Sequence, residues 1–486
     1  MGVVLHQSFK NTLIIFVGFA IGGINVLFLY THFLEAEYFG LVTFLLSASN
    51  ILMPLLIFGT QHTIIKFYSS YRDRVDRDNF LVTAIILPLF IIIPLAFIGT
   101  MFYDYISDLL SRENIIIKKY TYFIFLIAVL MGYFEVFYAW SKVQLKSVFG
   151  NFIREIFGRV CVTILLFSVY LGWLNSDQFI YGILFVYAAR MVIIKIYAFQ
   201  LYFPKVKHFV LPGNIKEILS FSFFIILAGS AGSILLEIDK FMIPQMEKIE
   251  QVAYYSVGVF IATVISIPSR AMQQIVNPLT AKELNEGNMT NVESLYKKTS
   301  INLLIVGGLF FLLINININE IYTIINKPEY SIGIYIVLMI SIAELFKLSL
   351  GTNGAILTNS KYYRIFFYFS IAMALSVIAL NKILIELLGI EGAALATLIV
   401  VLVFGIIKVI YIRSKLQIHP YSNSTKIVLV IITVLFVAFY FLVLPVSPLL
   451  SIILKSSIVT LLFSVLTVKF RLSEDINNLI RKYFFK

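Results

Sequence analysis

The sequence contains little of what soluble enzymes and metalloproteins are built from. Only 13% of its 486 residues are charged, one is cysteine and five are histidine. A single cysteine, Cys161, excludes an internal disulfide framework and a thiolate metal site, and the scattered histidines lack the spacing of metal ligands. No glycine-rich phosphate loop is present, which excludes intrinsic ATP hydrolysis. We therefore expect no cofactor, no metal and no catalytic residue, and predict that the chain is not an enzyme.

Long apolar stretches take the place of the missing polar residues. Sixty per cent of the chain is hydrophobic, and fourteen apolar stretches follow one another from Asn11 to Phe470. A bilayer core of ~30 Å takes ~20 helical residues to cross, and each backbone amide in lipid must be satisfied within its own segment. We predict an all-α polytopic membrane protein with 14 transmembrane helices. The predicted spans are 12–33, 39–60, 80–102, 120–140, 152–174, 178–201, 218–238, 251–269, 298–318, 331–352, 362–384, 389–412, 425–445 and 449–469.

Lysine and arginine are distributed unevenly between alternate loops. If the N-terminus is cytoplasmic, most of the 38 basic residues fall in inside segments. The outside segments then hold only Arg112, Lys118, Lys119, Lys240, Lys248, Lys327, Lys382 and Lys455. The positive-inside rule therefore places both termini in the cytoplasm of an inner-type membrane. The net charge of +12 reflects this topology and attraction to anionic lipid headgroups, and requires no nucleic-acid partner.

A weak internal repeat divides the sequence. Ser8–Phe9 opens one helix and precedes EAEYFGLVTF (Glu35–Phe44), whereas Ser222–Phe223 opens another and precedes EQVAYYSVGVF (Glu250–Phe260). Parallel repeats of this kind are a known transporter plan. We therefore predict two six-helix bundles, 1–208 and 209–420, around a central cavity, with helices 13 and 14 and a cytoplasmic tail in 421–486.

Several ordered motifs resemble one family. They are AEYFGLVTF (Ala36–Phe44), LLEIDKFMI (Leu235–Ile243), NKPEYSIGIYIVLMISIAELF (Asn326–Phe346), GAILTNSKYYR (Gly354–Arg364) and GIEGAALATLIVVLVFG (Gly389–Gly405), followed by KLQIHP (Lys415–Pro420). Their order resembles polysaccharide flippases of the multidrug/oligosaccharidyl-lipid/polysaccharide exporter superfamily, over essentially the whole chain. The resemblance implies that undecaprenyl-diphosphate-linked oligosaccharide units, such as those of lipopolysaccharide O-antigen, are flipped across the bacterial cytoplasmic membrane by alternating access. Implied partners are this glycan, membrane lipids, H⁺ or Na⁺ as coupling ion in an antiporter, and polysaccharide polymerase and chain-length proteins.

Charged residues within the predicted spans are the candidate site residues. An ionised group in hydrocarbon costs ~3 kcal/mol or more and normally faces a cavity or a partner. The candidates for a cationic, substrate-binding cavity are Arg154, Arg159, Arg190, Lys195 and Lys347. The candidates for ion coupling are the carboxylates of Glu135, Glu237, Asp239 and Glu344.

Structural interpretations stand beside most of these candidates. Arg159 could pair with Glu155 at i,i+4, and Lys347 with Glu344 one turn away. Arg154 and Lys195 could extend to the cytoplasmic headgroups. In the same way, Glu237 could pair with Lys240, and Asp239 could cap its helix. Arg190 has no acid within one turn, which favours a cavity role, and its planar guanidinium suits a diphosphate.

Three alternative functions stay open. A multidrug exporter of the same fold would favour net acid in the cavity for cationic substrates, which this chain lacks. A peptidoglycan lipid-precursor flippase is a close relative of the predicted function. A membrane polysaccharide polymerase or ligase would need a sizeable outside loop, whereas the longest outside gap, Tyr103–Lys119, is short and holds no histidine.

Overall fold

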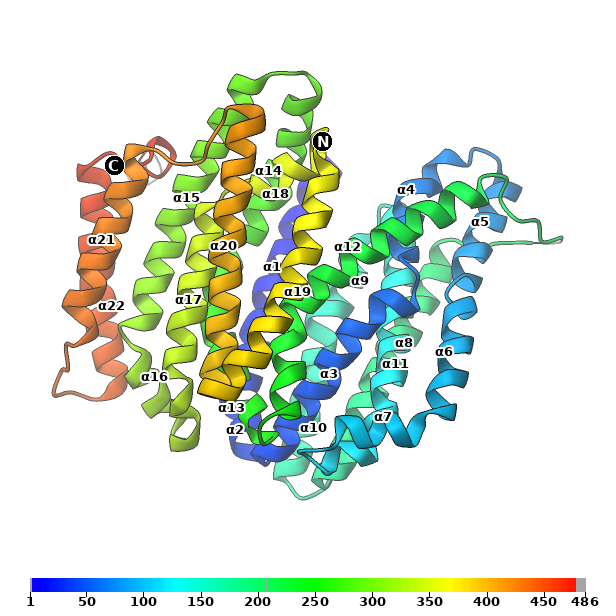
Figure 1. Ribbon diagram of the computed structural model, residues 1–486, viewed down its shortest axis with the longest axis horizontal. Coiled ribbons are helices and arrows are strands. Elements are labelled where there is room, and N and C mark those ends of the chain that lie inside the picture. The colour runs from blue at the N-terminus through cyan, green and yellow to red at the C-terminus, as the bar shows by residue number, and fades with distance from the viewer. Residues whose placement is uncertain (1, 207, 478–486) are drawn as a thin grey trace. The chain divides into compact units, whose positions relative to one another are not determined.

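The computed structural model describes residues 2–206 and 208–477, and these residues form helices and connecting turns without a strand (Figure 1). The side chains of residues 2–6, 8, 9, 227–229, 270, 271 and 274 are outside the description. The predicted all-α polytopic membrane fold is therefore confirmed. Contacts between Cα atoms divide the chain into two compact units, Met1–Ala253 and Tyr254–Lys486. The predicted division after residue 208 separates the two copies of the sequence repeat, which is a different criterion from compactness. It stays a prediction.

Thirteen helical segments in the described ranges are long and apolar enough to cross a membrane, and they coincide with thirteen of the fourteen predicted spans. They are Lys10–Phe33, Ala36–Leu56, Arg74–Met101, Ile116–Val143, Ser176–Leu201, Ile215–Gln245, Glu250–Ser269, Met289–Asn315, Pro328–Ser349, Tyr363–Leu388, Ile390–Leu416, Asn423–Tyr440 and Pro448–Lys469. The count of fourteen is not confirmed. The remaining predicted span, 152–174, is helical from Ser147 to Tyr170 but carries three charged residues, Arg154, Glu155 and Arg159.

The first unit is built from twelve α-helices and four shorter helical turns among its described residues. In chain order they are α1 (Gly2–Ile24), η1 (Asn25–Leu29), α2 (Tyr30–Phe33), α3 (Ala36–Leu56), α4 (Thr60–Phe67), η2 (Tyr68–Ser70), α5 (Arg74–Ile86), α6 (Leu89–Met101), α7 (Tyr103–Leu110), α8 (Ile116–Val143), α9 (Ser147–Phe152), η3 (Ile153–Phe157), α10 (Gly158–Tyr170), α11 (Ser176–Leu201), α12 (Ile215–Met242) and η4 (Ile243–Gln245). The segments η1 and η3 are π-helical, so each inserts an extra residue into a turn.

The second unit is also helical throughout its described part. The helix α13 (Glu250–Thr263) starts just before it, and the unit continues with η5 (Val264–Ser266), α14 (Ile267–Asn285), α15 (Met289–Asn315), α16 (Ile318–Ile325), η6 (Pro328–Gly333), α17 (Ile334–Ser349), α18 (Asn353–Asn359), α19 (Tyr363–Leu388), α20 (Ile390–Leu416), α21 (Asn423–Tyr440) and α22 (Pro448–Lys469). The helix α15 packs against α17, α21 and α22, and fourteen of its residues are buried.

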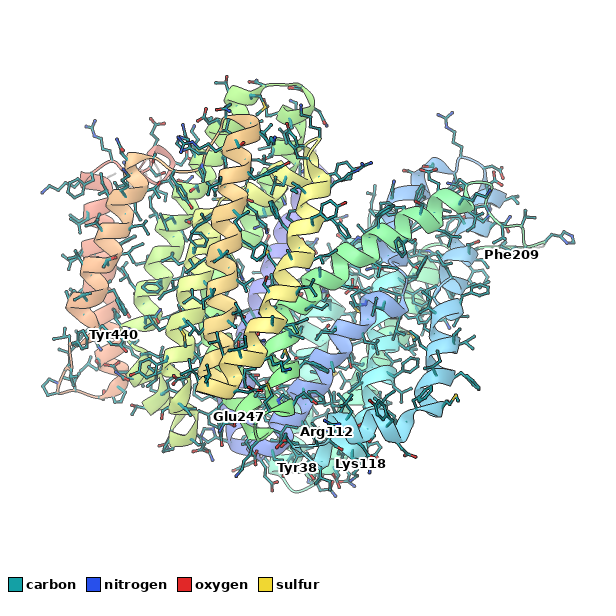
Figure 2. The ribbon with its side chains drawn as sticks, in the orientation of Figure 1. Tyr38, Arg112, Lys118, Phe209, Glu247 and Tyr440 are labelled. Atoms are coloured by element: carbon teal, nitrogen blue, oxygen red, sulfur yellow. The ribbon has the colours of Figure 1, made fainter. Side chains whose placement is uncertain are left out.

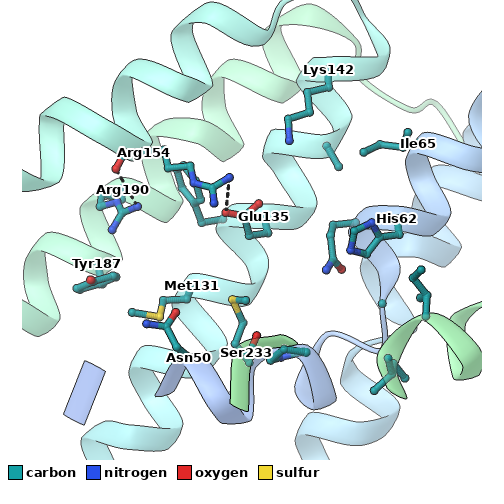
Figure 3. A pocket seen from close by; sticks show the side chains of 18 of the residues that line it. Asn50, His62, Ile65, Met131, Glu135, Lys142, Arg154, Tyr187, Arg190 and Ser233 are labelled. Atoms are coloured by element: carbon teal, nitrogen blue, oxygen red, sulfur yellow. Dashed lines mark hydrogen bonds and ion pairs between the residues drawn. The ribbon is translucent and has the colours of Figure 1, made fainter. Parts of the chain in front are cut away.

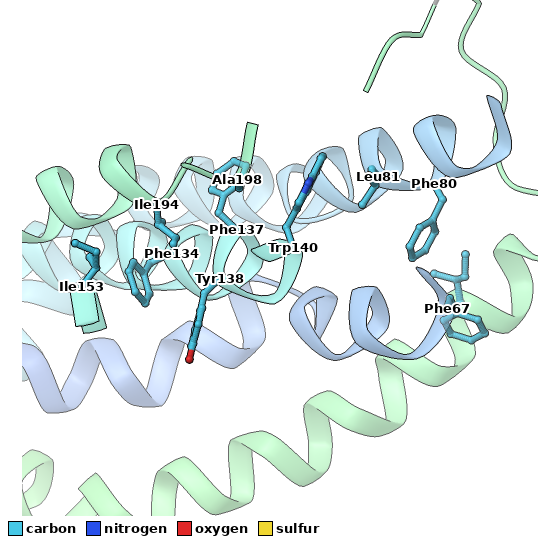
Figure 4. Packing of buried hydrophobic residues seen from close by; sticks show 11 residues of the cluster. Phe67, Phe80, Leu81, Phe134, Phe137, Tyr138, Trp140, Ile153, Ile194 and Ala198 are labelled. Atoms are coloured by element: carbon cyan, nitrogen blue, oxygen red, sulfur yellow. The ribbon is translucent and has the colours of Figure 1, made fainter. Parts of the chain in front are cut away.

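Helix α8 forms the centre of the first unit. It packs against α3, α4 and α11, and sixteen of its residues are buried. Aromatic side chains fill one end of this core, with Phe134, Phe137 and Trp140 of α8 beside Phe67 and Phe80 (Figure 4). Buried aromatic residues contribute large apolar areas to such a core. The core therefore fixes α8 as the scaffold on which the neighbouring helices are placed.

The predicted second span is broken where α3 ends. Phe58 and Gly59 both adopt positive φ, at 50° and 63°, a conformation that is uncommon for a bulky residue. A Cβ on Gly59 would lie 2.4 Å from Cγ2 of Ile225 on α12, so only glycine fits here. Beyond the break, the hydroxyls of Thr63 and Ser222 lie 2.8 Å apart. The break therefore turns α4 toward the beginning of α12.

The opposite end of the first unit is held by polar contacts. The Asn114 side chain donates to the carbonyls of Pro244 and Glu247, at 2.7 and 2.9 Å, and accepts from the Ile249 amide at 2.8 Å. Lys119 pairs with Asp177 at 2.7 Å. Figure 2 shows Tyr38, Arg112, Lys118 and Glu247 together at this end, and all four belong to segments predicted to face outside.

A buried ion pair holds α22 to α16 in the second unit. Lys455 is 2% exposed, and its ammonium lies 2.5 Å from Oε1 of Glu320. The Ser451 hydroxyl also donates to Oε1 of Glu320, at 2.8 Å. Burial raises the pKa of Glu320, but the hydrogen bonds from Lys455, its own backbone and Ser451 outweigh it, so that the pKa lies below its ordinary value.

Candidate functional site

A polar cavity of about 550 Å³ lies inside the first unit (Figure 3). It is surrounded by α3, α4, α8, η3, α10, α11 and α12. Its lining residues are Asn50, Met53, Pro54, Gly59, Gln61, His62, Ile65, Met131, Phe134, Glu135, Ala139, Lys142, Arg154, Glu155, Arg159, Tyr187, Arg190, Ile225, Ile226 and Ser233. This volume lies in the range of pockets that hold small ligands or headgroups.

The π-helix η3 and the start of α10 present three charged side chains to the cavity. Nη1 of Arg154 lies 3.5 Å from Oε1 of Glu135, and its Nε lies 3.7 Å from Oε1 of Glu155. Nη1 of Arg159 lies 3.2 Å from Oε2 of Glu155 and also donates to the Glu155 carbonyl at 3.0 Å. Two carboxylates thus balance two arginines within one cluster.

Glycines on α1 provide the space for Arg159. A Cβ at Gly18 would lie 2.6 Å from the Glu155 carbonyl oxygen and 2.7 Å from Nη1 of Arg159. A Cβ at Gly22 would lie 3.1 Å from Nε of Arg159. One turn further, the Asn25 side chain donates to the Arg159 carbonyl at 2.9 Å and accepts from the Thr163 hydroxyl at 2.8 Å. The first helix therefore fits closely against the charged segment.

Arg190 on α11 is stabilised differently from the other two arginines. Its guanidinium carbon lies 4.9 and 4.8 Å from the ring centroids of Phe134 and Tyr187, and Nη2 makes a long contact of 3.5 Å with the Arg154 carbonyl. Among the described residues, no carboxylate lies within 4.0 Å of it, and its buried Nε has no hydrogen-bond partner. A cation in this state is suited to an anionic ligand.

The cavity carries an excess of positive charge. Four basic side chains line it, from Lys142, Arg154, Arg159 and Arg190, against the two carboxylates of Glu135 and Glu155. With the imidazole of His62 neutral, the lining has a net charge of two positive units. Fixed charges in a low-dielectric, concave site act strongly on an ion of opposite sign. The arrangement favours a ligand with about two negative charges.

The structure brings four predicted site residues together and places the others elsewhere. Arg154, Arg159, Arg190 and Glu135 line the cavity. Lys195 is exposed on α11, 5.9 Å from the centroid of the Phe199 ring, and is absent from the lining. The remaining predicted residues are Glu237 and Asp239 on α12, and Glu344 and Lys347 on α17.

Glu237, Glu344 and Lys347 form ion pairs outside the cavity. Oε2 of Glu237 lies 3.1 Å from the Lys240 ammonium and accepts from the Ser47 hydroxyl at 2.8 Å. The Lys347 ammonium lies 2.7 Å from Oε1 of Glu344, in the second unit. Asp239 is buried, at 7% exposure. These contacts match the structural interpretations given for Glu237 and Lys347, and their functional roles stay predictions.

Three polar residues of this cavity, Gln61, His62 and Lys142, are absent from the candidates that the sequence predicts. The Lys142 ammonium lies 3.8 Å from the Tyr138 ring centroid, on the last turn of α8. The break at Phe58–Gly59 brings Gln61 and His62 to the same cavity. Hydropathy does not indicate this break. The only sequence signal is weak, and it is Gly59 shortly before the polar residues Gln61 and His62.

Comparison with known families and structures agrees with this architecture. A family model described as "Polysaccharide biosynthesis protein" matches residues 8–274, more than half of the chain. No curated protein matches the chain closely enough to be counted as a relative. The family match confirms the resemblance to polysaccharide flippases that the motifs predicted.

Solved structures with similar folds include flippases and exporters. Lipid II flippase MurJ in an inward closed conformation has a TM-score of 0.71 and 16% identity, over 95% of this chain and 98% of that chain. An inward-facing multidrug resistance MATE family transporter of the MOP superfamily has a TM-score of 0.61 and 16% identity, over 85% and 94%. A MOP superfamily transporter from Pyrococcus furiosus, described by a reverse polarity of its binding pocket, has a TM-score of 0.58 and 14% identity, over 85% of this chain and 95% of that chain. At these identities the likeness shows the fold alone.

Proposed function

The chain belongs to the polysaccharide biosynthesis protein family, and from this premise we propose that it is a flippase for lipid-linked glycans. The substrate is an undecaprenyl-diphosphate-linked oligosaccharide repeat unit, such as one of lipopolysaccharide O-antigen. It is carried from the inner to the outer leaflet of the bacterial cytoplasmic membrane by alternating access. The two predicted six-helix halves move against each other during this cycle, and both termini lie in the cytoplasm.

The single observation that carries this proposal is the cation excess of the cavity. A diphosphate diester carries two negative charges at neutral pH, which equals the excess of two basic side chains in the lining. Arg190 supports the same assignment, because its guanidinium contacts aromatic rings rather than a carboxylate in the described structure. The planar guanidinium can donate two parallel hydrogen bonds to phosphate oxygens.

Ion coupling is assigned to Glu135 among the predicted carboxylates. Its carboxylate lies in the cavity beside Arg154, with Glu155, His62 and Lys142 as the other charged or titratable lining groups of this region. When the diphosphate enters, it competes with Glu135 and Glu155 for the same guanidinium groups. A coupling ion, H⁺ or Na⁺, that neutralises Glu135 then favours the bound state, and its departure favours release.

Two relatives of the same fold define the alternatives. A multidrug exporter of cationic compounds would be disfavoured by repulsion from the four basic side chains of the cavity. A flippase for a peptidoglycan lipid precursor shares the diphosphate headgroup chemistry, and the fold similarity to lipid II flippase MurJ favours it as the second candidate. The two flippase functions differ in the glycan, which the cavity charges do not distinguish.

Deletion of the gene in its own host tests the proposal. We expect loss of surface polysaccharide, together with accumulation of lipid-linked repeat units that stay accessible only from the cytoplasmic side. Complementation with the wild-type gene is the control. Undiminished polymer without this accumulation would contradict the polysaccharide assignment, and arrest of peptidoglycan synthesis would support the second candidate instead.

A further inference from the structure

The second unit holds a cation within a membrane span that pairs with no carboxylate in the described part of the chain. Lys408 lies on α20, eight residues before the helix ends at Leu416, and it is half-buried. Its ammonium lies 3.3 Å from Sδ of Met373 and 5.3 Å from the centroid of the Phe366 ring, both on α19. Among the described residues, no carboxylate oxygen lies within 4.0 Å of this ammonium. A thioether and a ring face are weak partners for a charge.

The Lys408 side chain does not extend toward the cytoplasmic headgroups. In the proposed topology α20 ends at the cytoplasmic side, and eight helical residues place Lys408 about 12 Å from that end. Because Cα–Cβ bonds tilt toward the N-terminus of a helix, the side chain leaves α20 in the direction away from the cytoplasm. The contact with Met373 agrees, since Met373 lies ten residues into α19 from its cytoplasmic start at Tyr363. A lysine that reached for headgroups would point the opposite way.

A second ammonium lies on the neighbouring helix. The helix α20 packs against both α17 and α19 (Figure 1), and Gly405 allows a close approach, because a Cβ there would overlap the ring of Phe346 on α17. The next residue, Lys347, repels Lys408. Lys347 pairs with Glu344 at 2.7 Å, and its side chain is still 35% exposed. Two ammonium groups thus share one carboxylate, which leaves a net charge of one positive unit.

An unpaired charge within a membrane span destabilises a protein and is typical of a functional position. We propose that Lys408 and Lys347 bind a carboxylate of the carried headgroup, so that the substrate is an acidic glycan rather than a neutral one. This inference rests on the proposed function and deepens it by naming the substrate class. One carboxylate equals the charge excess of this group, whereas the excess in the first unit equals the charge of a diphosphate. An acidic sugar supplies such a carboxylate, and so does the peptide of a peptidoglycan precursor.

The test is a binding measurement on the full-length protein in phosphatidylcholine nanodiscs. The probes are methyl glucuronide, the neutral methyl glucoside, N-acetyl-D-alanine and inorganic diphosphate. We expect the wild type to prefer the glucuronide to the glucoside about tenfold, since the carboxylate adds a hydrogen bond between charged groups. Lys408→Met should abolish this preference and leave diphosphate binding unchanged. Lys415→Met is the matched control, because Lys415 is exposed on the same helix, and it should bind all four probes like the wild type.

Thermal stability separates loss of binding from loss of structure. Lys408→Met replaces an unpaired charge among Met373 and Phe366 with an apolar side chain of similar length. Its Tm should therefore equal or exceed the Tm of Lys415→Met. A lower Tm would show that Lys408 holds the helices together, and this result would overturn the proposal.

The remaining outcomes distinguish this inference from the proposed function. If the wild type binds diphosphate but does not discriminate the glucuronide from the glucoside or bind N-acetyl-D-alanine, the carboxylate site is wrong and the proposed function stands. If it prefers the glucuronide through Lys408 but binds no diphosphate, the carboxylate site stands and the diphosphate assignment fails. Stronger, Lys408-dependent binding of N-acetyl-D-alanine would support the site and identify a peptide as the source of the carboxylate. Displacement of the glucuronide by phosphatidylglycerol in the nanodisc would assign the site to an anionic lipid and overturn the proposal.

Discussion

Arg190 differs from its neighbours in how its charge is balanced. Arg154 and Arg159 each lie within 4 Å of a carboxylate, whereas Arg190 contacts the faces of Phe134 and Tyr187. A cation–π contact contributes ~0.5–2 kcal/mol. It does not use the N–H groups of the guanidinium, which can still donate hydrogen bonds to a ligand. Arg190 is therefore the cavity cation that gains most from an anionic ligand. We therefore predict a loss of anion binding when the charge or the shape of the Arg190 side chain is changed.

Arg190→Ala should weaken binding of inorganic diphosphate about ten- to hundredfold, since a hydrogen bond to a charged group contributes ~1.5–3 kcal/mol. Arg190→Lys should restore binding only in part, because an ammonium cannot donate two parallel bonds. Lys195→Ala is the matched control on the same helix and should bind like the wild type. Isothermal titration of the purified protein measures all three. Equal affinity in Arg190→Ala and Lys195→Ala would remove Arg190 from the proposed site.

The sequence could predict the cavity charges only where they stand out from an apolar span. Arg154, Arg159 and Arg190 lie within predicted spans, so the cost of a charge in hydrocarbon makes them candidates. Lys142 lies on the last turn of α8, where a lysine is ordinary. Its place in the cavity depends on tertiary packing that hydropathy does not encode. The roles of all these residues stay predictions until they are tested.

Among the helices, α1 packs closely against η3 and the start of α10 because Gly18 and Gly22 have no side chain. Gly18→Ala would place Cβ 2.6 Å from a backbone carbonyl that cannot rotate away. Overpacking of this kind costs about 1–3 kcal/mol, so we expect a lower Tm and displacement of Arg159. Gly99→Ala on α6 meets no atom within 4 Å and should raise stability slightly through helix propensity. A thermal-shift assay of both variants in nanodiscs is the measurement, and a Gly18→Ala protein as stable as Gly99→Ala would contradict the packing described.

The ion pair between Glu320 on α16 and Lys455 on α22 predicts how substitutions there change the stability of the protein. Lys455→Met leaves the Glu320 carboxylate without its partner in a buried site, which costs about 3–5 kcal/mol. The double variant Lys455→Met/Glu320→Leu removes both charges and should recover most of the Tm. Equal Tm values for the single and the double variants would show that the pair does not hold α22 in place.

The same pair predicts a dependence on pH. The pKa of Glu320 is lower in the folded protein than its ordinary value of 4.5, so its contribution to stability is complete above that value. The contribution is lost as the pH falls through the folded pKa. The Tm of the wild type should therefore fall more steeply below pH 4.5 than the Tm of Lys455→Met/Glu320→Leu. Parallel acid profiles of the two proteins would contradict this assignment.

The elements themselves were largely predictable, whereas their irregularities were not. Apolar runs of about twenty residues can only be helices in lipid, and thirteen predicted spans have counterparts in the described structure. The sequence does not predict the π-helices at Asn25–Leu29 and Ile153–Phe157 or the positive φ of Phe58. Such features leave no periodic signal in an apolar sequence. They nevertheless shape the cavity, because η3 carries Arg154 and Glu155 and the break after α3 carries Gly59.

The family, the fold and the charge pattern of the cavity are consistent with one another across the whole molecule. The family match and the MurJ- and MATE-like folds agree with the predicted class of protein. The positive charge of the cavity favours a lipid diphosphate over a cationic drug as the proposed substrate. The predicted halves, 1–208 and 209–420, would move against each other during transport. The predicted coupling to H⁺ or Na⁺ would drive this movement.

Reconstitution of the purified protein into liposomes that contain a fluorescent undecaprenyl-diphosphate-linked glycan measures the proposed flippase activity itself. The measurement is the fraction of this lipid that becomes accessible to a membrane-impermeant quencher over time. We predict rapid loss of sidedness with the wild type, and no more than the protein-free rate with Arg190→Ala. A wild-type protein that leaves the lipid in its original leaflet, under a proton gradient of either direction, would contradict the proposed function.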